Sequence, residues 1–111
     1  MTYPELLEEV KKIEFREKRA EMPGFLEFVV SKESLSPLTG TLEIFFGHPF
    51  KPANQSPSHE ASTYSAPYGG IQKNQTLYYR EADGATHCAL LWPWSDGKLI
   101  TVKIAVQAAK R

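Results

Sequence analysis

The stretch that decides the fold runs from residue 75 to residue 106 and reads QTLYYREADGATHCALLWPWSDGKLITVKIAV. Its aromatic and β-branched residues suit a pleated, half-buried surface. The pairs Asp83-Gly84 and Asp96-Gly97 divide it into three runs. Asp-Gly between such runs is a strong hairpin signal, because the turn requires positive φ angles. From Ile100 to Val106 the apolar residues alternate strictly, as in a strand with one face in a core. The stretch therefore predicts a three-stranded antiparallel meander.

The N-terminus predicts a helix. Thr2 and Glu5 have the spacing of a capping box, in which each side chain satisfies a backbone amide of the first turn. Apolar residues then recur at helical spacing from Leu6 to Ile13. Two interpretations remain open for the residues after Ile13. The helix either continues to the breaker Met22-Pro23-Gly24, or it ends near Glu14 and leads into an extended arm.

Two further strands are predicted at residues 25–32 and 41–46, joined by a loose hairpin at residues 34–40. About five strands at ~4.8 Å spacing make a sheet roughly 24 Å wide, while one helix covers about 10 Å. The sheet must then curl, be covered by the central loop, or pair with a second copy of the chain. We favour strong curvature together with a homodimer. We expect one α+β domain over residues 1–111, with an N-terminal helix packed on a curved, mainly antiparallel sheet of about five strands and a long central loop.

The segment of residues 47–74 is the least regular part of the chain. It holds four of the eight prolines and almost no aliphatic residues beyond Ile71. Connections longer than about 15 residues without regular structure are uncommon, and they are often binding loops, lids or disordered segments. Three interpretations remain open: a mobile loop, a loop that binds a ligand or partner, and regular structure that the pattern does not reveal.

Composition limits the function classes. The chain carries 13 basic and 13 acidic residues, so its formal net charge is zero. Nucleic acids and anionic membranes favour a basic excess, so neither is an expected partner. The single cysteine, Cys88, has no second cysteine to pair with and fits a reducing compartment. The acidic N-terminus lacks the pattern of a secretory signal, and no run approaches the ~18 apolar residues of a membrane span. We expect a cytoplasmic protein.

Residues that could carry chemistry are few. His48, His59 and Glu60 lie in the central segment, and His87 and Cys88 are neighbours in a predicted strand, where adjacent side chains point to opposite faces. No paired-histidine or CxxC spacing occurs, so the sequence predicts no metal and no cofactor. A small enzyme or ligand-binding barrel that uses His48, His59 or His87 with a nearby carboxylate remains the alternative hypothesis.

Aromatic residues are the most informative feature for function. Tyrosine and tryptophan are favoured at interfaces because each offers a large rigid area with one polar tip. If the central loop folds back on the meander, one surface patch would contain Phe50, Tyr64, Tyr68, Tyr78, Arg80, Trp92 and Trp94. The competing interpretation is that about half of these residues complete the core. The patch hypothesis predicts a small non-enzymatic binding module that engages a protein or peptide partner.

Overall fold

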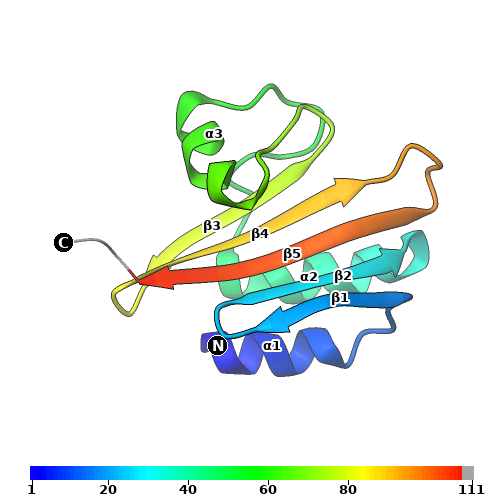
Figure 1. Ribbon diagram of the computed structural model, residues 1–111, viewed down its shortest axis with the longest axis horizontal. Coiled ribbons are helices and arrows are strands. Elements are labelled where there is room, and N and C mark those ends of the chain that lie inside the picture. Colours follow the sequence, from blue (N-terminus) through cyan, green and yellow to red (C-terminus); the bar gives the residue numbers. More distant parts are fainter. Residues whose placement is uncertain (109–111) are drawn as a thin grey trace.

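The computed structural model describes residues 1–108 and shows an α+β fold built on a five-stranded antiparallel sheet (Figure 1). The strand order is β1-β2-β5-β4-β3. The predicted fold class is confirmed. The elements are α1 (Tyr3–Lys11), β1 (Glu17–Met22), β2 (Phe25–Ser31), η1 (Lys32–Ser34), α2 (Leu35–Phe46), α3 (His59–Ser65), η2 (Ala66–Tyr68), β3 (Thr76–Ala82), β4 (Ala85–Pro93) and β5 (Leu99–Ala108), where η denotes a short 3-10 helix.

The C-terminal meander is confirmed in its strands and its turns. β3 pairs with β4, and β4 pairs with β5, both antiparallel. Asp83 and Gly84 have φ angles of 55° and 72°, the left-handed conformation that a two-residue hairpin requires. In the second turn the Asp96 carboxylate accepts hydrogen bonds from the amides of Lys98 and Leu99, at 2.8 Å and 3.3 Å. Local turn chemistry therefore sets the register of the meander.

The N-terminal helix is confirmed, and of the two interpretations of the residues after Ile13 the extended arm is the one observed. The Thr2 side chain accepts from the Glu5 amide, and the Glu5 carboxylate accepts from the Thr2 amide at 2.8 Å, which completes the capping box. The helix ends at Lys11. The arm after it forms β1, which pairs with β2 and supplies one edge of the sheet.

The predicted strand at residues 41–46 is wrong, and so is the hairpin at residues 34–40. Ser34 ends η1 and the residues from Leu35 onward belong to α2, because Leu38, Leu42 and Phe45 recur at spacings of four and three residues, as on one face of a helix. All three are buried. Ile44, which the strand assignment placed beside Leu42, is 68% exposed. The fifth strand of the sheet is β1 instead.

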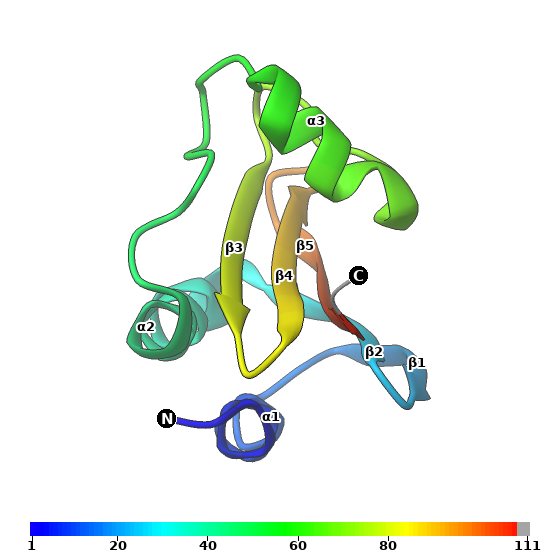
Figure 2. The same cartoon turned by 90° about the vertical axis from the view of Figure 1, so that its left-hand side faces the viewer.

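The helices divide between the two faces of the curved sheet (Figure 2). α1 and α2 contact each other on one face, here called the α1/α2 face, above the larger core cluster. α3 contacts β3 and β4 on the opposite face, here called the α3 face, above a smaller cluster. The coverage argument for a homodimer assumes a single helix, whereas this sheet carries α1, α2 and α3; the homodimer stays a prediction. Within residues 1–108 no helix is long and apolar enough to cross a membrane.

The central segment contains the regular structure that one interpretation left open. Ser58 caps α3, since its hydroxyl accepts from the Ala61 amide at 3.1 Å. Lys51 forms an isolated antiparallel bridge with Leu77 of β3. Its ammonium group is buried and donates to the backbone carbonyls of Gln72, Lys73 and Gln75, at 2.8, 2.6 and 2.5 Å. Lys51 thus ties the start of the segment to its end, and α3 lies between the two.

Candidate functional site

The structure divides the seven predicted patch residues between the two faces of the sheet. Tyr78 and Arg80 lie on the α1/α2 face, because they alternate along β3 with Leu77 and Tyr79. The Tyr78 side chain is 1% exposed, and its hydroxyl donates to the Glu43 carboxylate at 2.9 Å. Burial and this bond both raise the Tyr78 pKa. Tyr78 and Arg80 therefore do not join a patch with the other five residues.

Arg80 has a structural partner of its own. Its guanidinium donates to the Phe45 backbone carbonyl at 2.7 Å and lies 4.7 Å from the centre of the Phe45 ring. It therefore covers the end of α2.

The remaining predicted patch residues lie on the α3 face, and the structure adds further residues beside them. The α3-face aromatic surface consists of Phe25, Phe50, Tyr64, Tyr68, Tyr79, Trp92 and Trp94.

At the β3 end of this surface, three rings form a cluster. Tyr64 of α3 stacks on Tyr79 of β3, with ring centres 3.9 Å apart and planes within 8°. Phe50 packs edge-on against Tyr64 at 5.4 Å and is 42% exposed. The Tyr79 hydroxyl donates to Glu81 at 2.8 Å. Burial, with this bond, raises the Tyr79 pKa, so the group stays a neutral phenol at physiological pH.

Beside the stack lies a cavity of about 220 Å³ between α3 and the sheet, here called the tyrosine hollow. Its lining combines aromatic rings with small polar groups: Thr63, Tyr64, Pro67, Tyr68, Tyr79, Thr86, Cys88, Gln107 and Ala108. Burial raises the pKa of the Cys88 thiol to about 12, so the group is a neutral thiol and a poor nucleophile. The hollow therefore suits packing of an apolar side chain better than covalent chemistry.

Trp92 occupies the middle of the aromatic surface. The Lys103 ammonium lies 3.7 Å from the centre of its ring and donates to the Tyr68 carbonyl at 2.9 Å. Gly69, with φ of 105°, approaches so closely that a Cβ atom there would lie 2.5 Å from the Trp92 ring. Tyr68 also stacks on Phe25 of β2, with planes within 13°. η2 is thereby fixed to the sheet, and only glycine fits at its end.

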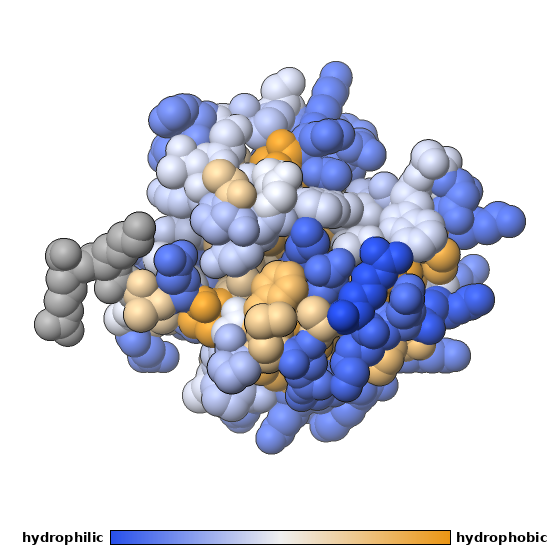
Figure 3. All heavy atoms as spheres, in the orientation of Figure 1, coloured by the Kyte–Doolittle hydropathy of each residue, from blue (hydrophilic) through white to orange (hydrophobic). Residues whose placement is uncertain are grey.

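Trp94 extends the surface toward the β1 edge. Its indole nitrogen donates to the Thr101 hydroxyl at 2.8 Å, which lays the ring over β5. The Arg19 guanidinium lies 5.5 Å from the ring centre. In the space-filling view, apolar residues gather in the middle, over the sheet below α3, with hydrophilic residues around them (Figure 3).

The three histidines lie on different elements. His48 is exposed just after α2, and His59 is the exposed first residue of α3. His87 is buried on the α1/α2 face against Tyr3 and Phe45, whereas its neighbour Cys88 lies under α3. Across residues 1–108 no group of three or more His, Cys, Asp or Glu side chains is placed to hold a metal ion.

Sequence reasoning missed three contributors to the surface. Tyr79 shares a face with Leu77, so strict alternation along β3 could have selected it in place of Tyr78. Phe25 and Lys103 are brought to the surface by the pairing of β2 with β5, which no local pattern reveals.

Comparison of the chain with family models, with curated proteins and with solved structures gave no match.

Proposed function

We propose that this protein is a small non-enzymatic binding module that engages an extended peptide segment of a partner protein on the α3-face aromatic surface. One observation carries the proposal: none of the seven aromatic residues of that surface is fully buried, since six are half-buried and Phe50 is exposed. The aromatic residues buried in the main core, such as Phe45 and Tyr78, keep almost no area in contact with solvent. Partly exposed tyrosine and tryptophan are the residues most often found at the centre of interfaces.

The shape of the surface favours a peptide over a compact drug-sized ligand. Sites for drug-sized ligands are concave and usually enclose about 300–1,000 Å³, whereas the tyrosine hollow, at about 220 Å³, offers room for a single side chain. Further rings lie outside the hollow, from Phe50 against Tyr79 of β3 to Trp94 above Thr101 of β5. We therefore expect one aromatic or large aliphatic side chain of the peptide to enter the hollow while its neighbours lie across Trp92 and Trp94.

The proposed setting is the cytoplasm. Cys88 is a buried free thiol under α3, which fits a reducing compartment. The charges around the surface are mixed, with Arg19 and Lys103 on one side and Glu81 on the other. Packing of apolar side chains, and not a strong charge, would then determine which peptides bind.

The proposal is tested by selecting binders from a library of random dodecapeptides on the purified protein. We expect selected peptides to share an aromatic or large aliphatic residue. Their binding is then measured by fluorescence polarisation on the protein and on a Phe50→Ala/Tyr68→Ala double variant. Loss of two rings from an interface centre should weaken binding at least about tenfold. Ile44→Ala is the matched control, because it removes an exposed apolar side chain from α2 on the opposite side of the sheet.

Two results would contradict the proposal. One is a library selection that enriches no peptide. The other is a set of peptides that bind the double variant as tightly as the original protein, or that lose as much affinity with Ile44→Ala. Amide chemical shifts in the presence of a selected peptide give a second reading, and they should move at Tyr64, Tyr79 and Trp92.

A further inference from the structure

A second cavity lies on the α1/α2 face, where α1 approaches the hairpin of β1 and β2. It encloses about 180 Å³ and is here called the α1 cleft. Its floor is formed by Val10, Leu26 and Phe28, all at most 5% exposed. Phe15 forms one wall and packs against Phe28 at 6.1 Å between ring centres. Phe15 is itself 41% exposed, so an apolar wall stands open to solvent.

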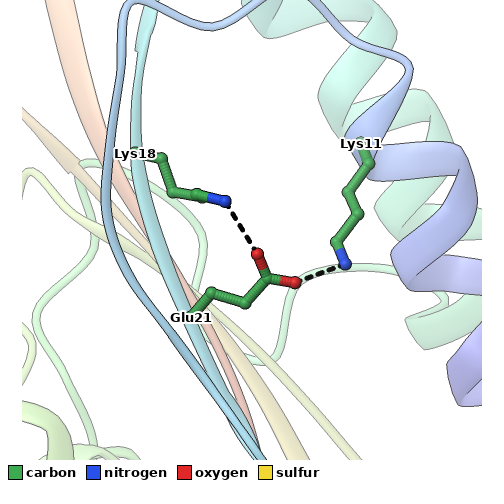
Figure 4. A network of polar contacts seen from close by, with 3 residues as sticks. All are labelled: Lys11, Lys18 and Glu21. Carbon is green, nitrogen blue, oxygen red and sulfur yellow. Dashed lines mark hydrogen bonds and ion pairs between the residues drawn. The ribbon is translucent and has the colours of Figure 1, made fainter.

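The rim of the cleft is charged. Glu21 of β1 holds two ammonium groups, that of Lys11 at 2.5 Å and that of Lys18 at 2.9 Å (Figure 4). The two lysines come from different elements, Lys11 from the last turn of α1 and Lys18 from β1. These hydrogen bonds lower the pKa of Glu21 to about 2, so the carboxylate is ionised at physiological pH. The rim therefore carries two positive charges and one negative charge.

A β-bulge creates this rim. In a regular strand Lys18 and Glu21, three residues apart, would point to opposite faces. The register of β1 against β2 shifts at Arg19, so Lys18 lies opposite Phe28 and Glu21 lies opposite Leu26. Both partners belong to the floor of the cleft. Bulges commonly re-aim side chains beside functional sites, and this one adds the second cation to the cleft.

From this arrangement we infer that the α1 cleft binds a small amphipathic monocarboxylate, a molecule with an aromatic ring or short alkyl chain and one carboxylate. The apolar body would lie on Val10, Leu26 and Phe28, and the carboxylate would meet the ammonium groups of Lys11 and Lys18. A volume of 180 Å³ corresponds to a body of roughly six carbon atoms, on the basis of about 30 Å³ per water-sized unit.

Charge counting selects an anion over a cation. One added carboxylate balances the rim, giving two ammonium groups and two carboxylates, whereas an added ammonium group would give three positive charges and one negative. Because Lys11 and Lys18 already share Glu21, the ligand carboxylate and Glu21 compete for the same two donors.

The site does not depend on the proposed peptide surface, which lies on the other face of the sheet.

The test uses hexanoate as probe, with hexanamide and hexylammonium as matched neutral and cationic analogues. Methyl resonances of Val10 and Leu26 are followed by NMR during titration of the full chain at neutral pH. We expect saturable shifts with hexanoate at a dissociation constant on the order of a millimolar, typical for so few heavy atoms. The two analogues should bind at least about threefold more weakly. Added salt should weaken hexanoate and leave hexanamide unchanged.

Variants of the rim distinguish this site from general surface attraction. Lys18→Gln should weaken hexanoate about threefold. Lys12→Gln is the control and should have no effect, since Lys12 pairs with Glu9 and does not line the cleft. Glu21→Gln should strengthen hexanoate, because it releases both lysines from their competitor. All three side chains are exposed, so the fold is retained.

Several results would overturn the inference. These are shifts that do not saturate, equal affinity for hexanoate and hexylammonium, equal effects of Lys12→Gln and Lys18→Gln, or weaker hexanoate binding by Glu21→Gln. Tighter binding by Glu21→Gln together with weaker binding by Lys18→Gln, and no change with Lys12→Gln, would support it, since a general effect of net charge would act on both lysine variants alike.

Discussion

The two faces of the sheet use aromatic side chains in different ways. On the α1/α2 face, Phe45 and Tyr78 are 4% and 1% exposed, and the Tyr78 hydroxyl is bonded to Glu43. On the α3 face, Phe50 is 42% exposed, and the rings of Tyr64 and Trp92 are half-buried. Both faces belong to the same strands, so the difference comes from the elements that cover them.

Helix coverage explains the contrast. A five-stranded sheet is roughly 24 Å wide, and two helices of about 10 Å each nearly span it. α1 and α2 provide that cover on one face. On the other face α3 has seven residues, and its main contacts with the sheet are to β3 and β4. The rest of that face is covered by flat side chains, Trp92 under Lys103 and Trp94 under Arg19. The α1/α2 face thus buries the rings of the main core, with Phe15 in the wall of the α1 cleft as an exposed exception, whereas the aromatic residues of the α3 face are half-buried or exposed.

The largest expected effect comes from the covered face. Leu42→Ala should lower the free energy of unfolding by about 3 kcal/mol, because it leaves a cavity in the main core. Ile44→Ala is the control, with an expected loss below about 0.5 kcal/mol. Urea denaturation measures both. In a strand Leu42 and Ile44 would share one face, so equal losses would contradict both the helix and the comparison.

The second largest effect concerns the segment that carries α3. Lys51→Met should cost about 2 kcal/mol, because it leaves the carbonyls of Gln72, Lys73 and Gln75 without their common donor. Lys73→Met, which removes an exposed lysine of the same segment, should cost little. Hydrogen exchange should rise in α3 and in residues 72–75 of Lys51→Met. Unchanged exchange there would show that α3 is held by its apolar contacts alone.

The sequence predicts the parts of the fold that local chemistry determines. The Asp83-Gly84 and Asp96-Gly97 turns and the Thr2–Glu5 capping box occur as their residues indicate. The strand prediction for residues 41–46 fails because the spacing of Leu42, Ile44 and Phe46 fits the two-residue period of a strand, while the same residues also fit a largely apolar helix. Only the burial of Leu38 and Phe45 with the exposure of Ile44 decides between the two periods.

The candidate sites depend on contacts between distant residues, and for this reason less of them is predictable. Tyr64 and Tyr79 stack because α3 returns to β3, and Lys51 holds that return with carbonyls more than twenty positions away. The α1 cleft needs the bulge at Arg19, which no residue pattern in β1 marks. Residue type indicated that aromatic groups matter, but their distribution between faces depends on strand pairing.

A smaller effect is expected from pH. Burial lowers the pKa of His87, whose Nδ1 atom has no hydrogen-bond partner within residues 1–108. In the unfolded chain a histidine titrates near pH 6.5, so below that pH the unfolded state binds a proton that the folded state excludes. The free energy of unfolding should then be constant above about pH 6.5 and fall as the pH drops toward the lowered pKa, by at most about 1.4 kcal/mol per pH unit.

The pH prediction is checked by urea denaturation between about pH 5 and about pH 8, a range that spans the ordinary histidine pKa. His87→Gln should remove the slope between about pH 6.5 and about pH 5.5, since it removes the group that titrates there, whereas carboxylates such as Glu21 contribute only nearer the ordinary glutamate pKa. His59→Gln, which replaces an exposed histidine of α3, should keep it. A slope that persists in His87→Gln would assign the pH dependence to other groups.

The smallest expected loss of stability is on the open face, and it is the sharpest test of the comparison. Phe50→Ala should lower the free energy of unfolding by about 1 kcal/mol, the range of an aromatic pair, because the half-exposed ring loses its edge-on contact with Tyr64 and its tilted contact with Tyr79. The same change at buried Phe45 should cost several times more. If Phe50→Ala is as damaging as Phe45→Ala, Phe50 belongs to the core and the open face holds no spare rings. A small loss, measured beside weaker binding of a selected peptide, would show that Phe50 contributes more to recognition than to folding.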